Sequence, residues 1–466
     1  MINPTFVQIL DWGSIPLFDS ISKIIMHLTT FENVGGAWGE IEVMIPKKNN
    51  KGEELSFIEG VFALAQYVEY KIFHYIDKVT ESLFGFISVL PGAFSTFRWR
   101  CIQGEPLEAF LRGAKGSKCE LSFNWFQSNM YLAEDRIMCL EIICKEDEKW
   151  IMNYVPGAVW LTDPPLSLTS LIKQRRRWFN GSFFATLHVI MSIWKVWRRQ
   201  KSFLELFRIM FLFTYFIYMI INMILSFILV GSFYSAFSIL LRATFSTIDC
   251  SAVMPAYLFE NLYLIWLFFI LMLSTTVNIM WAEFFFRATS VIMGVFTLLT
   301  VCLTIYYYIC NGAETKSIIF LGIILISYFL PLLTNSRNIK IGRFMKGILY
   351  VIYMAPTYIN IITIYSFCNI NDISWGSRPV SAYEQTSDKE KVILFIQFRL
   401  FLNSFELIMY NYRKKKTILK TLDLGFSWFG WLLTELLDIL LQKLRKFGQT
   451  SWIIWQCLFR TSFHSN

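Results

Sequence analysis

The segment Gln174-Arg175-Arg176-Arg177-Trp178 lies shortly before the first long apolar run of the chain, and the rest of the chain is best understood from it. In a helix, Gln174, Arg177 and Trp178 occupy positions i, i+3 and i+4 and therefore share one face. That face offers an amide, a guanidinium fork suited to a diphosphate, and an aromatic ring that stacks on a sugar. The alternative is a basic anchor at the membrane surface before a membrane span.

Composition indicates a membrane protein. Of the 466 residues, 55% are hydrophobic and 45 are Phe, and the mean hydropathy is +0.47. Several windows exceed the ~18 apolar residues that indicate a transmembrane helix. The formal net charge is +9, with much of the basic excess beside apolar runs. This placement favours anionic lipid as a partner over nucleic acid.

Membrane spans are predicted in the most apolar stretches, near residues 204–231, 257–280, 289–310, 317–334 and 345–366. Basic side chains before the first span, among them Lys195 and Arg198, place residues 1–200 in the cytoplasm. Five crossings would leave the following segment outside the cell. Either a further crossing within residues 232–247 or an interfacial position for residues 345–366 would return it to the cytoplasm.

Acidic residues occur at two positions that suit chemistry. Asp11 follows a predicted buried strand, residues 6–10, and precedes Trp12-Gly13, an arrangement that presents an acid to a metal or a nucleotide. Ordinary turn chemistry is the alternative. Glu134 and Asp135 are predicted to open a helix, whose dipole keeps a carboxylate ionised; the alternative is a simple helix cap.

Three further segments carry local structural signals. Glycines within residues 33–41 allow close backbone approach, either to a ligand or to another strand. Residues 57–78 have the periodicity of an amphipathic helix, which lies in the membrane interface or packs on a sheet. Pro-Gly inside the apolar run Val89–Ala93 predicts a tight turn between two buried elements.

These segments resemble the motifs of one family, the chitin synthases, and occur in that family's order. Ala133–Arg136 and Gln174–Ser182 look like its acceptor-site motifs. Its other motifs are similar to Leu10–Ser14, Gly39–Ile41, Val89–Ala93, Pro356–Asn360 and Asn371–Arg378. The resemblance covers residues 1 to about 380, and the stretch beyond matches poorly.

The resemblance implies an α/β GT-A-like cytoplasmic catalytic domain, here partial, followed by an α-helical polytopic transmembrane domain in the plasma membrane. The expected organisation is a catalytic part at residues 1–182, an interfacial amphipathic helix at 183–201, transmembrane helices at 202–366, a loop with the Ser-Trp-Gly-Ser-Arg motif at 367–390 and a C-terminal membrane-associated segment at 391–466. In the family, a uridine-binding strand precedes the position of Asp11, so we expect the chain to be truncated at its N-terminus.

The implied reaction is processive, inverting transfer of N-acetylglucosamine from UDP-N-acetylglucosamine to a growing β-1,4 chain, which leaves through the enzyme's own membrane channel. Asp135 is the implied general base, and Glu134 orients it. The implied ligands of acceptor and diphosphate are Gln174, Arg177, Trp178 and Arg136. The implied channel gate is Val89, Leu90, Pro91, Gly92 and Ala93, and a further motif near the active site is Ser374, Trp375 and Gly376. Asp11 is the implied ligand of a divalent metal, Mg²⁺ or Mn²⁺.

The expected partners are UDP-N-acetylglucosamine, the growing chitin chain, membrane lipids and a second copy of the chain in a homodimer, without nucleic acid. Two alternatives stay open. One is a synthase of another β-linked polysaccharide, such as hyaluronan or cellulose, because Gln-x-x-Arg-Trp is shared among these enzymes. The other is a non-catalytic membrane partner of a full-length synthase, because the truncation leaves the activity of this chain open.

Overall fold

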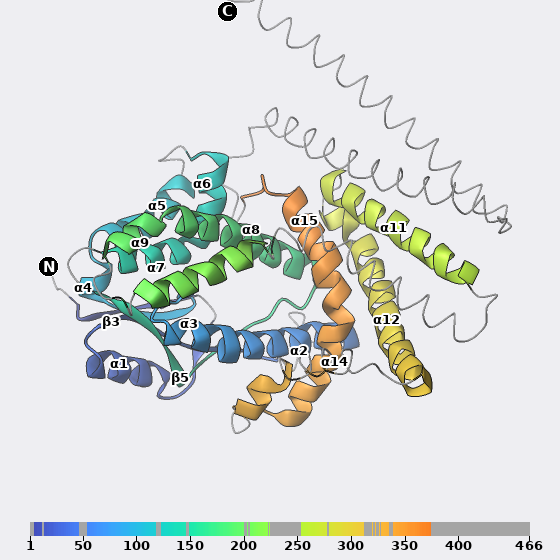
Figure 1. Ribbon diagram of the computed structural model, residues 1–466, viewed down its shortest axis with the longest axis horizontal. Helices are drawn as coiled ribbons and strands as arrows, with labels where there is room; N and C mark the ends of the chain where they lie inside the picture. The colour runs from blue at the N-terminus through green and yellow to red at the C-terminus, as the bar shows by residue number, and fades with distance from the viewer. Residues whose placement is uncertain are drawn as a thin grey trace, which may run out of the picture. The chain divides into compact units, whose positions relative to one another are not determined.

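A mixed five-stranded sheet with the order β1-β4-β3-β5-β2 organises the N-terminal part of the computed structural model (Figure 1). Antiparallel pairs join β1 to β4, β4 to β3 and β5 to β2, whereas β3 and β5 run parallel. The strands are β1 (Phe6–Leu10), β2 (Ile15–Pro16), β3 (Val34–Val43), β4 (Phe94–Arg98) and β5 (Ile151–Thr162).

The structure describes most of the first 373 residues, and all of these lie in a unit formed by residues 1–391. The described ranges are 4–11, 14–45, 54–117, 123–145, 149–199, 206–221, 253–276, 279–311, 328–334 and 339–373, with a few isolated positions between them. The expected motif Ser374-Trp375-Gly376 and the expected segment 391–466 lie outside these ranges.

Helices cover the sheet, and in Figure 1 α1 lies on one side of it while α5, α7 and α9 lie on the other. The α-helices of the N-terminal part are α1 (Ser20–Thr30), α2 (Phe57–Ile72), α3 (Val79–Leu83), α4 (Trp99–Ile102), α5 (Glu105–Ser117), α6 (Trp125–Met130), α7 (Glu134–Cys144), α8 (Leu168–Met191) and α9 (Ile193–Arg199). The later ones are α11 (Val253–Thr276), α12 (Ile279–Asn311), α14 (Ile341–Pro356) and α15 (Thr363–Cys368). Shorter segments are the π-helices η1 (Phe73–Lys78) and η4 (Thr357–Ile362) and the 3-10 helix η2 (Tyr131–Ala133).

The central strand β3 is buried along almost its whole length. A Cβ added to Gly39 would lie 2.1 Å from the carbonyl oxygen of Ala158 in β5, so this glycine lets two strands approach. The strand alternative for this glycine segment is therefore confirmed. Strand β1 is also confirmed, but the expectation that it is buried is wrong: among the described strands it pairs only with β4, and it lies half-exposed at the edge.

The predicted amphipathic helix at residues 57–78 is confirmed as α2 continued by the π-helical turn η1. Its start is capped by a reciprocal pair, in which Ser56 and Glu59 each accept the other's backbone N–H. The helix packs on β3 and along α14, where Gly347 comes close to Val68. This arrangement agrees with the alternative that the helix packs on a sheet.

Helix α8 differs from the expected domain organisation. It runs without a break from Leu168 to Met191, so the boundary expected at residue 182 falls inside a helix. The separate interfacial helix predicted for residues 183–201 is therefore wrong in extent. The physical reason is local: the segment from Phe179 to Ser182 contains one glycine and no proline, and a single glycine costs a helix only about 1 kcal/mol.

Two helices of the described residues, Ile279–Leu299 and Ile341–Cys368, are long and apolar enough to cross a membrane by length and composition. Shorter apolar helices occupy Leu206–Ile221 and Ile265–Thr275. The polytopic arrangement with five spans stays a prediction. The expected span 345–366 has a notable environment, because α14 packs against α2 and α15 packs against α8, both of which belong to the N-terminal part.

Candidate active site

The predicted face of α8 is formed. Ser167 caps the helix by accepting the backbone N–H of Ser170 at 3.2 Å, and Gln174, Arg177 and Trp178 follow in helical register. The side-chain oxygen of Gln174 is buried and accepts no hydrogen bond within the described part of the chain. Buried acceptors are normally satisfied, so this oxygen is an exception among the described side chains of the predicted face.

The ring of Trp178 is framed by two neighbours. The guanidinium carbon of Arg175 lies 4.6 Å from the centroid of the indole, and the ring of Tyr70 lies 6.3 Å away at a tilted angle. A cation over an aromatic face is attracted by the ring quadrupole. The half-buried ring of Trp178 therefore has defined neighbours on α8 and α2, and the membrane-anchor alternative stays open.

The acidic pair Glu134 and Asp135 opens α7, as predicted. Helix α8 reaches the turn before this pair at Gly181, where an added Cβ would lie 3.1 Å from that of Ala133. Burial raises the pKa of Asp135, while the positive charges of Arg136 and Arg177 act in the opposite direction. The structure thus brings the predicted base into the electrostatic environment of the predicted diphosphate ligand.

The predicted tight turn at Val89–Ala93 is confirmed, and it links two parts of the site. The N–H of Asp11 donates to the carbonyl of Ala93 at 3.4 Å, which places the exposed Asp11 beside the turn. On the other side, the N–H of the fully buried Leu90 donates to Sγ of Cys139 at 3.2 Å. Cys139 lies one helical turn after Asp135 on α7, so the turn connects the metal candidate to the helix of the base.

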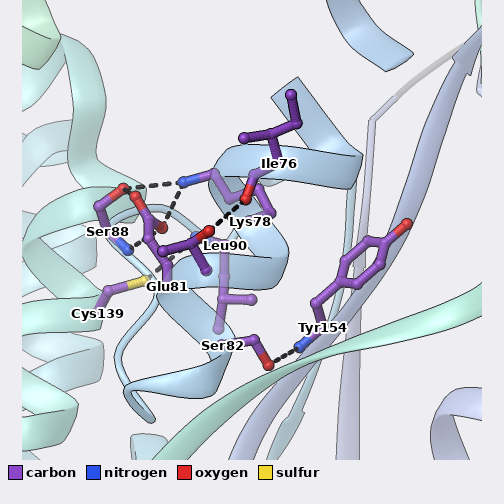
Figure 2. Close-up of polar contacts among 9 residues, drawn as sticks. Ile76, Lys78, Glu81, Ser82, Ser88, Leu90, Cys139 and Tyr154 are labelled. Carbon is purple, nitrogen blue, oxygen red and sulfur yellow. Dashed lines mark hydrogen bonds and ion pairs between the residues drawn. The ribbon is translucent and has the colours of Figure 1, made fainter. Parts of the chain in front are cut away.

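A buried ion pair behind this turn was missed by sequence reasoning (Figure 2). Lys78 Nζ lies 2.6 Å from Glu81 Oε2 and 2.9 Å from Ser88 Oγ, and the Lys78 and Glu81 side chains are 1% and 5% exposed. The other Glu81 oxygen accepts the Ser88 hydroxyl at 2.7 Å, and the Ser88 N–H also donates to this carboxylate. The available signal was a Lys-x-x-Glu spacing at the end of an apolar helix, which suggests a solvated surface pair.

Helix α8 is also bonded to α15 and to the segment that follows it. The fully buried Arg176 pairs with Asp372 Oδ2 at 2.6 Å and donates to the carbonyl of the same residue. Asn180 donates to the carbonyl of Ser366 at 3.1 Å. The described end of the predicted Asn371–Arg378 motif therefore lies against α8, next to the acceptor-site segment.

The metal candidate has a limited set of donors. No cluster of three or more His, Cys, Asp and Glu suited to a metal occurs among the described residues. Mg²⁺ nevertheless binds through one or two carboxylates together with substrate phosphates and water. The exposed carboxylate of Asp11 fits that minimal role.

The described part of the chain thus combines a mixed sheet covered by helices, an acidic pair at the start of α7, and an arginine and a tryptophan on α8. This combination is consistent with a glycosyltransferase. Residues 1–193 match the chitin synthase-like glycosyltransferase domain. The chain therefore carries, over residues 1–193, a glycosyltransferase domain of the chitin synthase family.

Individual relatives extend the similarity well beyond that domain. Chitin synthase 1 of Saccharomyces cerevisiae is 31% identical over 449 residues, which cover 91% of this chain and 38% of the relative. Chitin synthase 2 of Mycosarcoma maydis is 32% identical and chitin synthase C of Aspergillus oryzae 31%, each over 81% of this chain and over 37% and 42% of the relatives. The chain thus spans about two fifths of the length of these proteins.

Proposed function

We propose that this chain carries the acceptor side of a chitin synthase site, which transfers N-acetylglucosamine from UDP-N-acetylglucosamine to the end of a β-1,4 chain. One observation carries the proposal: α8 approaches the turn before α7 at Gly181 and Ala133, and the positive charge of Arg177 acts on Asp135. A base beside a diphosphate ligand is the arrangement that an inverting transfer to a sugar hydroxyl requires.

In this reaction Asp135 accepts the proton of the acceptor's 4-hydroxyl, and the oxygen attacks the anomeric carbon from the face opposite UDP. The bond between that carbon and the diphosphate breaks as the glycosidic bond forms, and UDP leaves. Burial raises the pKa of Asp135, which makes the carboxylate a stronger base than an exposed aspartate. Glu134 orients its neighbour.

The remaining side chains bind and hold the reactants. Arg177, with Arg136 nearby, stabilises the negative charge that develops on the leaving diphosphate. A divalent Mg²⁺ or Mn²⁺ ion held by Asp11 would supply further neutralisation of that diphosphate. Gln174 donates and accepts hydrogen bonds with the acceptor, and Trp178 stacks on the apolar face of its sugar ring.

Polymer passage is the second part of the proposal. Val89, Leu90, Pro91, Gly92 and Ala93 form the mouth through which the lengthening chain enters a channel in the plasma membrane. The N-terminal part lies in the cytoplasm, in contact with lipid headgroups, and a second copy completes a homodimer. Since α15 packs against α8, we place residues 345–366 in the interface on the cytoplasmic side. The motif Ser374, Trp375 and Gly376 lies outside the described residues.

The direct test offers radiolabelled UDP-N-acetylglucosamine and UDP-glucose separately to membranes that contain the protein. We expect incorporation only from the first donor, into a product that chitinase degrades. The Asp135→Asn variant keeps the shape of the side chain but removes the base, so UDP release is expected to fall by about 10²–10⁴-fold while UDP binding persists. A variant that turns over at the parental rate would reduce Asp135 to a helix cap.

Two other functions give different results in the same assay. A chitinase-resistant polymer made from UDP-glucose would indicate a synthase of another β-linked polysaccharide. No incorporation by this chain alone, with restored incorporation when a full-length synthase is added, would indicate a non-catalytic membrane partner.

A further inference from the structure

The predicted acceptor tryptophan is held by an ion pair that joins α2 to α8. Arg175 contacts both oxygens of Glu69, with Nη1 at 2.5 Å from Oε1 and Nη2 at 3.0 Å from Oε2. The same guanidinium lies over the indole of Trp178 at 4.6 Å. A two-point contact fixes the plane of a guanidinium, so Glu69 determines which way the cation faces the ring.

A third element contributes to the same pair. The hydroxyl of Tyr358 donates to Glu69 Oε2 at 3.0 Å, although the two residues are 289 positions apart in the sequence. Tyr358 lies in the π-helical turn η4, which interrupts the apolar helix between α14 and α15. π-Helical turns inside α-helices occur frequently at functional sites. Through Glu69 and Arg175, the orientation of the Trp178 ring is thus linked to η4, the turn between α14 and α15.

We propose that Glu69 and Arg175 are positioning residues, which set the angle of the Trp178 ring for the acceptor sugar. The inference rests on the proposed function, in which that ring stacks on the sugar. The side chains of Arg175 and Glu69 are 12% and 35% exposed, so solvent screens their attraction less than that of a surface pair. Stacking on a sugar needs a defined ring plane, and a fixed cation on the ring supplies it.

A merely structural ion pair would hold α2 against α8 without affecting the acceptor. The two roles separate when the charges are exchanged. In the double variant Glu69→Arg/Arg175→Glu the helices remain joined by a pair of opposite charges, but a carboxylate replaces the cation over the indole. A structural role predicts recovery by the exchange, whereas a positioning role predicts none.

The experiment measures the dissociation constant of chitotetraose by saturation-transfer NMR, with the full chain in detergent, and that of UDP in parallel. Glu69→Gln is expected to weaken chitotetraose binding by about 2- to 30-fold, the range that a cation over an aromatic ring contributes. UDP binding is expected to stay unchanged. Tyr358→Phe, which removes one hydroxyl and is least disruptive to folding, should give a smaller loss in the same direction.

The matched control is Glu283→Gln, which breaks a Glu–Arg pair with Arg287 on α12. It should leave both dissociation constants at their parental values. Parental chitotetraose binding in Glu69→Gln and Tyr358→Phe, or full recovery in the exchanged variant, overturns the positioning role. Parental binding in Trp178→Ala would instead refute the stacking on which the proposed function depends, so the two failures are distinguishable.

Discussion

Replacing Lys78 by methionine tests whether the buried ion pair holds the turn Val89–Ala93 in place. The substitution keeps the length of the side chain but leaves the carboxylate of Glu81, 5% exposed, without its cation. Breaking a buried pair by removing one partner costs about 3–5 kcal/mol. The N–H and hydroxyl of Ser88 still donate to this carboxylate, so we expect the lower end, about 3 kcal/mol.

Thermal unfolding of the detergent-solubilised protein measures this cost. For a unit of residues 1–391 the entropy of unfolding, about 2.1 cal/mol/K per residue, makes 1 kcal/mol correspond to about 1 °C in Tm, so Lys78→Met should lower Tm by about 4 °C. The control is Lys195→Met, which breaks a pair with Glu141 whose lysine is 57% exposed. Exposed pairs contribute about 0–1 kcal/mol, so the control should shift Tm by about 1 °C at most.

Two results would refute the reasoning about this pair. One is a Tm for Lys78→Met equal to that of Lys195→Met, which would mean that Glu81 reaches water despite its burial. The other is a double variant Lys78→Met/Glu81→Leu that is no more stable than Lys78→Met, because removal of both charges should recover most of the loss. Polymer formation measured on the same preparations reports whether the displaced turn also impairs the site.

Three further predictions concern single side chains. Burial raises the pKa of Asp77 to about 6 from 3.8, so between these pH values the folded state holds a proton that the unfolded state has lost. The free energy of unfolding should therefore decrease by up to about 3 kcal/mol as the pH rises from 4 to 6. Tm measurements as a function of pH should show this decrease, and Asp77→Asn should abolish it. Gly39→Ala should destabilise the sheet by about 3 kcal/mol because its Cβ would meet the Ala158 carbonyl, while Gly60→Ala, with open space around it, should stabilise α2 slightly in the same assay. Trp178→Ala should abolish polymer formation while membrane insertion persists; loss of insertion instead would support the membrane-anchor interpretation.

The sequence alone determined the local elements and their chemistry. Apolar periodicity predicted the helix at residues 57–78, the acidic pair predicted the start of α7, and Pro-Gly predicted the turn at Val89–Ala93, because each signal depends on neighbours within one or two helical turns. The order of the motifs also sufficed to indicate the chitin synthase family, which the comparisons confirmed.

Only the tertiary structure decided which of these elements meet. From the sequence, Gly39 could allow close approach of either a ligand or another strand. The structure shows that the neighbour is the parallel strand β5. In the sequence, Lys78 and Glu81 have the spacing of a surface ion pair. In the structure both side chains are buried, and Ser88, just before the turn Val89–Ala93, donates to the carboxylate. The carboxylate of Glu69 binds both Arg175 and the hydroxyl of Tyr358, which lies 289 positions further along the chain. A contact of that range depends on how α2, α8 and η4 pack together, which no local periodicity specifies.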